Sequence, residues 1–126
     1  MSMETPLGRV RGLGSAKSGT EHWWHQRMTA LALIPLTGWF AVSLIVLASG
    51  DYHQAVDWIR DPIVAGLLVL MLAAGYYHLK LGMQVIIEDY VHVEWLKLAA
   101  LIVVTFWCIA LALASIMAVV WIWLGG

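Results

Sequence analysis

Three long apolar stretches divide the chain, and short polar segments separate them. The stretches cover about residues 29–48, 62–87 and 96–124, and each is long enough for the roughly 20 helical residues that cross a hydrocarbon core. The separators run from Asp51 to Asp61 and from Glu88 to Glu94. This pattern predicts an all-α integral membrane protein with three transmembrane helices. Residues 1–28 are predicted to form an N-terminal arm, and residues 29–126 a single membrane domain.

The composition agrees with a membrane protein and excludes several other classes. Of the 126 residues, 62% are hydrophobic and 12% are charged, whereas a soluble domain has roughly half and a quarter. The net charge of -1 and the absence of a Lys/Arg run argue against a nucleic-acid partner. A lone cysteine, Cys108, provides neither a disulfide framework nor a cysteine metal cluster. The first apolar stretch begins too late and is too long for a cleaved secretory signal.

The distribution of basic residues predicts the orientation in the membrane. Four of them, Arg9, Arg11, Lys17 and Arg27, precede the first span, whereas the loop after it carries only Arg60 among three aspartates. Basic residues favour the cytoplasmic side, so the N-terminus is predicted to be cytoplasmic and the C-terminus external. Tryptophans near the span ends suit interfacial positions: Trp23, Trp24, Trp58, Trp95, Trp121 and Trp123.

His78 lies deep in the second apolar stretch, where an ionisable side chain is costly and indicates a function. At 100° per residue, Ala74, Gly75 and Gly82 lie within about 60° of its direction, so the surrounding face is almost bare. A flat macrocycle fits against such a face, which favours His78 as a ligand of haem iron. Two alternatives remain: the small residues allow close helix packing, and the imidazole hydrogen-bonds to a neighbouring helix.

A six-coordinate b-type haem needs a second axial ligand, and this chain offers none at the depth of His78. The other histidines, His22, His25, His53 and His92, fall in the arm or the loops by this interpretation. The second ligand is therefore expected from a partner subunit with its own intramembrane histidine.

Further polar residues lie toward the predicted cytoplasmic end of the second span. Asp89 follows His78 by eleven residues in nearly the same direction, and Tyr90 comes next. A phenol beside an acid can donate a hydrogen bond to a quinone and assist proton delivery, although an interfacial tyrosine looks the same. Arg27 suits a haem propionate or the positive-inside pattern alone. Lys80 either extends its stem to the interface or pairs with a carboxylate such as a propionate.

Two segments resemble a known family. The run from His78 to Val91, His-Leu-Lys-Leu-Gly-Met-Gln-Val-Ile-Ile-Glu-Asp-Tyr-Val, is similar to a segment of the bacterial hydrophobic membrane anchor of succinate dehydrogenase (complex II). The run from His22 to Ala30 resembles the start of the first helix in bacterial members. In the family pattern Lys80 stands where an apolar or aromatic residue is expected.

This resemblance implies a function for the chain within a complex. It implies His78 as an axial ligand of the haem b iron, Arg27 as a propionate contact, Tyr90 as a ubiquinone hydrogen-bond donor and Asp89 near the ubiquinone. It further implies a bacterial inner-membrane complex with a second anchor subunit supplying the other haem histidine, an iron–sulfur subunit and a flavoprotein. That complex serves electron transport in the respiratory chain and the tricarboxylic acid cycle.

Succinate oxidation itself is expected in the flavoprotein, so this chain is predicted to be a non-catalytic anchor subunit. The alternatives are a cofactor-free membrane anchor and a fumarate reductase anchor. A proton-coupled transporter is disfavoured, because every Asp and Glu falls at a span end or in a loop or the arm.

Overall fold

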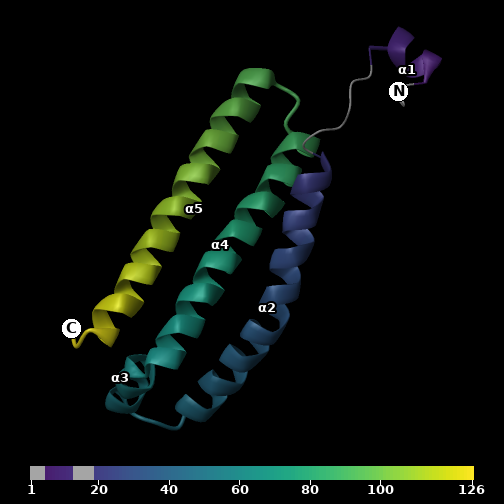
Figure 1. Ribbon diagram of the computed structural model, residues 1–126. Coiled ribbons are helices and arrows are strands. Elements are labelled where there is room, and N and C mark those ends of the chain that lie inside the picture. Colours follow the sequence, from purple (N-terminus) through teal and green to yellow (C-terminus); the bar gives the residue numbers. More distant parts are fainter. Residues whose placement is uncertain (1–4, 13–18) are drawn as a thin grey trace.

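The structure, a computed structural model, describes residues 5–12 and 19–126 and shows five helices within them. These are α1 (Pro6–Val10), α2 (Gly19–Leu47), α3 (Tyr52–Arg60), α4 (Pro62–Tyr90) and α5 (Glu94–Trp123). The three long helices run antiparallel, with α4 between α2 and α5 (Figure 1). Of the predicted N-terminal arm, residues 1–4 and 13–18 lie outside the described part, Lys17 among them.

The three long helices confirm the prediction of three membrane-spanning segments. They contain 29, 29 and 30 residues and are apolar enough to cross a membrane. Among the described residues, six apolar side chains are buried: Leu36, Ala65, Leu68, Leu81, Ile87 and Cys108. Such sparse burial follows from the environment, because lipid solvates apolar side chains and membrane helices associate through close packing and polar contacts. The chain is therefore a multi-pass helical membrane protein.

The N-terminal end of α2 differs from the sequence-based prediction. The helix begins at Gly19, ten residues before the predicted span, and it contains His22 and His25. These histidines therefore lie in a helix, which the hydropathy pattern did not indicate. Hydropathy marks where a helix meets lipid, whereas the backbone hydrogen bonds that define the helix continue into polar residues. His25 also lies closer to His78 along the bundle than expected, since its ring contacts the neighbouring Tyr77.

The polar separator between the first two spans also contains a helix, α3, which the hydropathy pattern did not indicate. Asp51 Oδ1 accepts a hydrogen bond from the Gln54 amide at 2.9 Å and caps its start. Trp58 stacks on Trp39 of α2, with ring centroids 5.6 Å apart, and Arg60 Nε donates to the Ile122 carbonyl of α5 at 3.5 Å. The short helix thereby ties together the end of the bundle at which α2 finishes.

One aspartate defines the junction between α3 and α4. Asp61 ends α3, and its Oδ1 accepts from the amides of Ile63 at 2.8 Å and Val64 at 3.2 Å. Pro62 follows at the first helical position, where its missing N–H leaves no bond unmade. This cap fixes where α4 begins, and the start of α4 sets the depth and direction of every later side chain on the helix, including His78.

Candidate functional site

His78 faces α2, and both of its ring nitrogens meet polar side chains there. Nδ1 lies 3.0 Å from Thr29 Oγ1, and Nε2 lies 3.5 Å from Gln26 Nε2. The Thr29 hydroxyl donates at 2.8 Å to the carbonyl of His25. Because a hydroxyl has a single proton, Thr29 accepts from the Nδ1–H of His78. This network assigns the unprotonated nitrogen as Nε2, the atom that can bind a metal.

The bare face predicted around His78 is turned toward α2 of the same chain. A Cβ added to Gly75 would lie 3.9 Å from Leu33 Cδ2, and one added to Gly82 would lie 3.7 Å from Gln26 Nε2. The two glycines therefore let α2 approach α4 closely, as small residues do between membrane helices. Close helix packing, one of the two alternatives to a haem-binding face that the sequence left open, is present in the structure.

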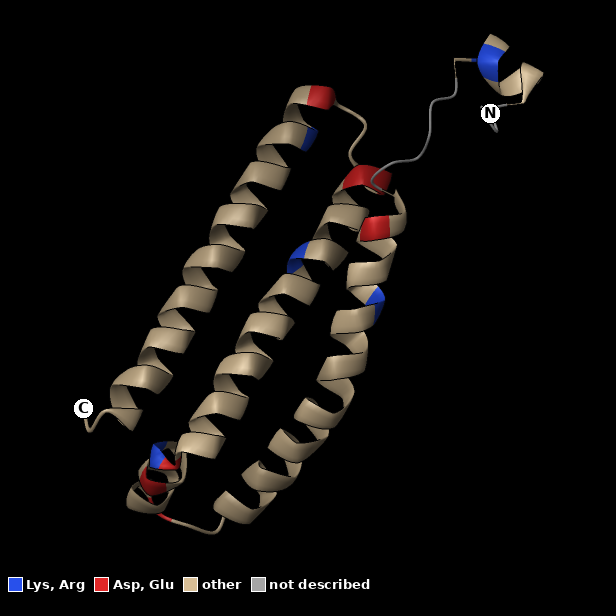
Figure 2. Cartoon of the chain, in the orientation of Figure 1, with Lys and Arg blue, Asp and Glu red and all other residues tan. Residues whose placement is uncertain are grey.

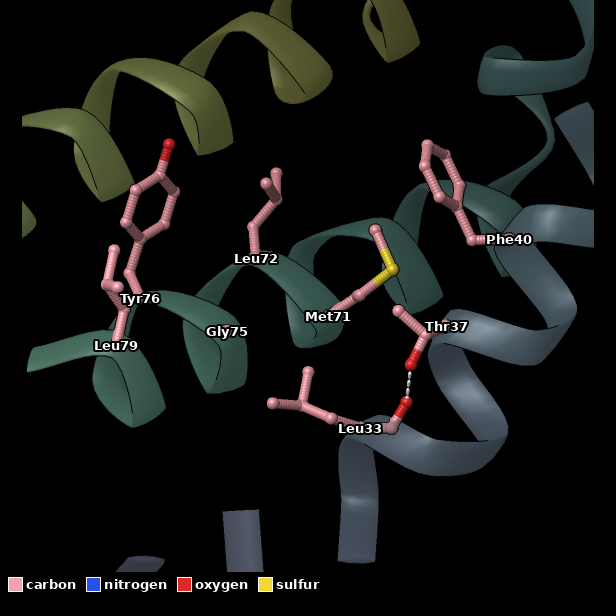
Figure 3. Close-up of a pocket in the computed structure, with 8 residues that line it drawn as sticks. All are labelled: Leu33, Thr37, Phe40, Met71, Leu72, Gly75, Tyr76 and Leu79. Atoms are coloured by element: carbon pink, nitrogen blue, oxygen red, sulfur yellow. Dashed lines mark hydrogen bonds between the residues drawn. The ribbon is translucent and has the colours of Figure 1, made fainter. Parts of the chain in front are cut away.

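Two hollows lie between α2 and α4, one toward each end of the bundle from His78. The larger hollow has a volume of about 540 Å³ and apolar walls, and the bare backbone of Gly75 forms part of it (Figure 3). Its lining comprises Leu33, Thr37, Phe40, Met71, Leu72, Gly75, Tyr76 and Leu79. The Thr37 hydroxyl bonds to the Leu33 carbonyl of its own helix (Figure 3), so this wall offers little polarity to a guest.

The second hollow, of about 390 Å³, is more polar and lies nearer the N-terminal end of α2. It is lined by Gly19, His22, Trp23, Gln26, Arg27, Gly82 and Val85. Two of its polar atoms, His22 Nε2 and Gln26 Oε1, are buried without a hydrogen-bond partner in the described part of the chain. Unpaired buried polar atoms are costly. The hollow is therefore suited to a guest that brings hydrogen-bonding groups.

Arg27 adds a positive charge to this second hollow. Its guanidinium carbon lies 5.6 Å from the centroid of the Trp23 ring, in a cation–π arrangement. The arginine side chain borders the hollow, and the stacked ring holds its planar group there. A guanidinium binds carboxylates with paired hydrogen bonds. Arg27 could therefore bind a carboxylate of a ligand in this hollow.

Tyr90 and Asp89 lie at the end of α4, away from His78. Asp89 follows His78 by eleven residues, or about 16 Å along the helix. Tyr90 is 78% exposed, its carbonyl accepts from His92 Nδ1 at 3.0 Å, and its hydroxyl has no hydrogen bond among the residues that the structure describes. The fold therefore does not bring Tyr90 into the groove with His78. It leaves the phenol open to a ligand or another chain.

Lys80 points in another direction. It lines a recess with Gln84 of α4 and Thr105 of α5, whereas the groove around His78 lies between α4 and α2. The two residues are about 200° apart around α4. This placement separates Lys80 from Arg27 and from the hollow that suits a carboxylate, so the interpretation of Lys80 as a partner of a haem propionate is not supported.

The sequence interpretation missed Gln26 and Thr29 of α2, which contact His78. Together with His22 they follow a spacing of four and three, which places all three on one helical face. That pattern would have identified them if the helix had been expected to start before residue 29. A second missed contact is the hydrogen bond of 3.0 Å between Tyr77 Oη and His25 Nδ1, which no local pattern in the sequence indicates.

Three antiparallel apolar helices, with one histidine held at a polar contact between two of them, define a multi-pass helical membrane protein. A family model described as succinate dehydrogenase/fumarate reductase transmembrane subunit matches residues 1–112. The chain belongs to this family, as the resemblance in the His78 to Val91 segment predicts.

Individual relatives agree with this assignment. The succinate dehydrogenase hydrophobic membrane anchor subunit of Rickettsia bellii is 33% identical over 111 residues, which are 88% of this chain and 89% of the relative. The protein of the same description from Paracoccus denitrificans is 30% identical over 109 residues, 86% of this chain and 84% of the relative. The succinate dehydrogenase membrane anchor subunit of Reclinomonas americana is 28% identical over 91 residues, 70% and 76% respectively. No solved structure matches the chain.

Proposed function

We propose that the chain is the membrane-anchor subunit of a succinate:ubiquinone oxidoreductase, that His78 ligates haem b, and that Tyr90 and Asp89 help to form the ubiquinone site. Family membership supports the anchor role. The observation that carries the haem assignment is the orientation of His78, whose Nδ1 is held by Thr29 at 3.0 Å. Histidines that bind metals commonly donate their other N–H to such an acceptor.

The residues present fit a haem. The contact of His78 Nε2 with Gln26, at 3.5 Å, is long and therefore weak, so iron can replace it. The apolar hollow next to Gly75 suits the hydrocarbon edge of a porphyrin, and the hollow with Arg27, His22 and Gln26 suits its propionates. When bound, haem b supplies a one-electron redox centre whose potential depends on ligand, burial and hydrogen bonds.

The second axial ligand is assigned to a partner anchor subunit. His25, the other histidine near this level, contacts Tyr77 of α4 through its Nδ1. Both His22 and His25 are on α2, next to the residues that already support His78. Because α2 is already packed against His78, a histidine from a different chain would suit the second position.

Tyr90 and Asp89 are proposed to act on ubiquinone, which receives electrons from an iron–sulfur partner subunit. The exposed phenol of Tyr90 can donate a hydrogen bond to a quinone carbonyl and so favour the developing negative charge. Asp89, exposed at the end of the same helix, can supply protons from the aqueous side. Succinate oxidation is assigned to a flavoprotein partner.

Replacement of His78 tests the haem assignment. The complex containing His78→Leu is expected to lose the six-coordinate b-type signal from its reduced spectrum, because leucine cannot bind iron. His25→Leu is the matched control, since it removes a histidine on the neighbouring helix and should keep the signal. An unchanged spectrum in the His78 variant would contradict ligation.

A cofactor-free anchor is the second candidate, and one observation favours it. Both nitrogens of His78 already have partners on α2, so the imidazole can serve as a polar contact between helices. The two candidates differ in the purified wild-type complex, which shows the absorption of a b-type haem under the first and none under the second.

A further inference from the structure

Lys80 is a cation within the membrane-spanning part of α4, and its role is not explained by the haem or ubiquinone proposals. It is the one Lys or Arg of α4, and it lies well inside the helix, whereas the acidic residues lie at the two ends of the bundle (Figure 2). Within residues 5–12 and 19–126 it has neither a hydrogen bond nor an ion pair. An ammonium at this position needs a partner.

The immediate surroundings of Lys80 form a small polar recess between α4 and α5. The recess has a volume of about 180 Å³ and is lined by Lys80, Gln84, Leu101, Val104 and Thr105. Gln84 Nε2 donates to Glu88 Oε1 at 2.8 Å, one turn further along α4. The Thr105 hydroxyl has no bond among the described residues. One cation and one available hydroxyl therefore face a space large enough for a single anionic group.

A separate apolar hollow lies beside this recess, toward the middle of the bundle. It has a volume of about 230 Å³ and is lined by Ala73, Tyr76, Tyr77, Lys80, Cys108, Ile109, Ala112 and Ile116. Lys80 lines both spaces. Ile109 is 51% exposed and Tyr77 is 38% exposed, so the apolar hollow opens on the outer surface of this chain. The two spaces together match an amphipathic molecule with an anionic head and an apolar chain.

The depth of Lys80 is compatible with a lipid headgroup. Lys80 precedes the end of α4 by ten residues, and α4 is about 43 Å long against a hydrocarbon core of about 30 Å. If the excess is shared between both ends, the Cα of Lys80 lies roughly 8 Å inside the core, and an extended lysine side chain nearly reaches the boundary.

We propose that the α4–α5 face holds one anionic phospholipid, with its phosphate at Lys80 and Thr105 and one acyl chain in the apolar hollow below. The charge of the recess selects the headgroup, and the adjoining hollow selects the chain. This lipid site is independent of the groove between α2 and α4, so it does not rest on the haem assignment.

Native mass spectrometry of the detergent-purified complex with added phosphatidylglycerol tests the site. Lys80→Met keeps the length of the stem and removes the charge, and we expect about ten-fold weaker binding of one phosphatidylglycerol molecule. Lys97→Met is the matched control, because Lys97 lies near the same end of the bundle but does not line the recess, and it should bind as the wild type does. Equal binding by the wild type and Lys80→Met would overturn the proposal.

The ligand class is tested with two further lipids. Phosphatidylcholine has a phosphate but no net charge, and it should bind the wild type more weakly than phosphatidylglycerol. Oleate has a carboxylate in place of the phosphate. Stronger binding of either lipid than of phosphatidylglycerol would overturn the assignment to an anionic phospholipid.

A second measurement needs no variant and remains decisive if Lys80→Met fails to assemble. Phosphatidylglycerol carrying a photoactivatable diazirine in one acyl chain is cross-linked to the wild-type complex, and the modified peptides are mapped. We expect cross-links at Ala73, Ile109, Ala112 or Ile116. Cross-links found only on α2 or on other subunits would overturn the proposed position of the lipid.

Discussion

At the scale of single residues, one hydroxyl decides which nitrogen of His78 is available. The Thr29 hydroxyl donates a hydrogen bond to the His25 carbonyl and accepts one from the Nδ1–H of His78. The imidazole is thereby fixed in one tautomer and one orientation before any ligand binds. This is the arrangement that outer partners of metal-binding histidines provide, and their loss usually weakens metal binding.

Thr29→Val is expected to weaken haem binding while leaving the fold intact, because valine has the shape of threonine but cannot accept the Nδ1 proton. The loss of this outer contact should lower haem affinity roughly tenfold or more, measured as haem retained per complex during titration with apomyoglobin as a competing acceptor. Thr29→Ser keeps the hydroxyl and should retain wild-type affinity. Equal loss in both variants would show that the methyl group, and not the hydroxyl, is important.

Tyr90→Phe is expected to impair ubiquinone reduction selectively. The variant removes the phenol oxygen and keeps the ring, so quinone reductase activity should fall roughly tenfold or more through the lost hydrogen bond. Succinate oxidation with a soluble artificial acceptor should be unchanged, since that reaction is assigned to the flavoprotein. If both activities fell equally, the assignment of Tyr90 to the quinone site would be incorrect.

At the scale of elements, capping side chains, and not the boundary of the membrane, set the residues at which α3 and α4 begin. Asp51 and Asp61 satisfy the first amides of the two helices, as side chains of this type do at N-termini. Hydropathy contains no information on such caps. For this reason the apolar pattern does not indicate α3, whereas it misses the first ten residues of α2 because the helix continues beyond the apolar stretch into polar residues.

Asp61→Ala is expected to destabilise the bundle by about 1 kcal/mol, because it removes the acceptor for two backbone amides at the start of α4. The measurement is the midpoint of thermal unfolding of the detergent-purified complex. Asp57→Ala is the matched control, since the pair of Asp57 with Arg60, at 3.9 Å, is solvent-exposed and should contribute between about 0 and 1 kcal/mol. A larger effect for Asp57 than for Asp61 would contradict the capping role.

At the scale of the whole molecule, the antiparallel arrangement places the two long-helix connections at opposite ends of the bundle (Figure 1). The loop with Ser49 leads from α2 to α3, and the loop with His92 leads from α4 to α5. Together with the basic residues before α2, this arrangement predicts that the loop with His92 lies on the cytoplasmic side and that Ser49 lies on the external side.

Cysteine labelling in intact cells tests this orientation. In a Cys108→Ala background, Ser49→Cys should react with a membrane-impermeant maleimide added outside, whereas His92→Cys should react only after the membrane is opened. The reverse result would show that the N-terminus is external, contrary to the prediction from the basic residues.

The sequence by itself determined the class of protein, the three spans and the family. These follow from local facts: the length of each apolar run, the cost of a charged group in lipid, and the His78 to Val91 segment. The sequence also singled out His78 as a candidate site residue, because a deep ionisable side chain stands out without knowledge of its neighbours.

Only the tertiary structure decided what surrounds these residues. It placed Thr29 and Gln26 against His78, directed the glycine face toward α2, and turned Lys80 toward α5. Such contacts depend on which helix lies beside which and at what rotation. That choice is made by small residues and polar pairs distant in sequence, and apolar periodicity alone does not encode it, because lipid accepts an apolar face as readily as another helix does.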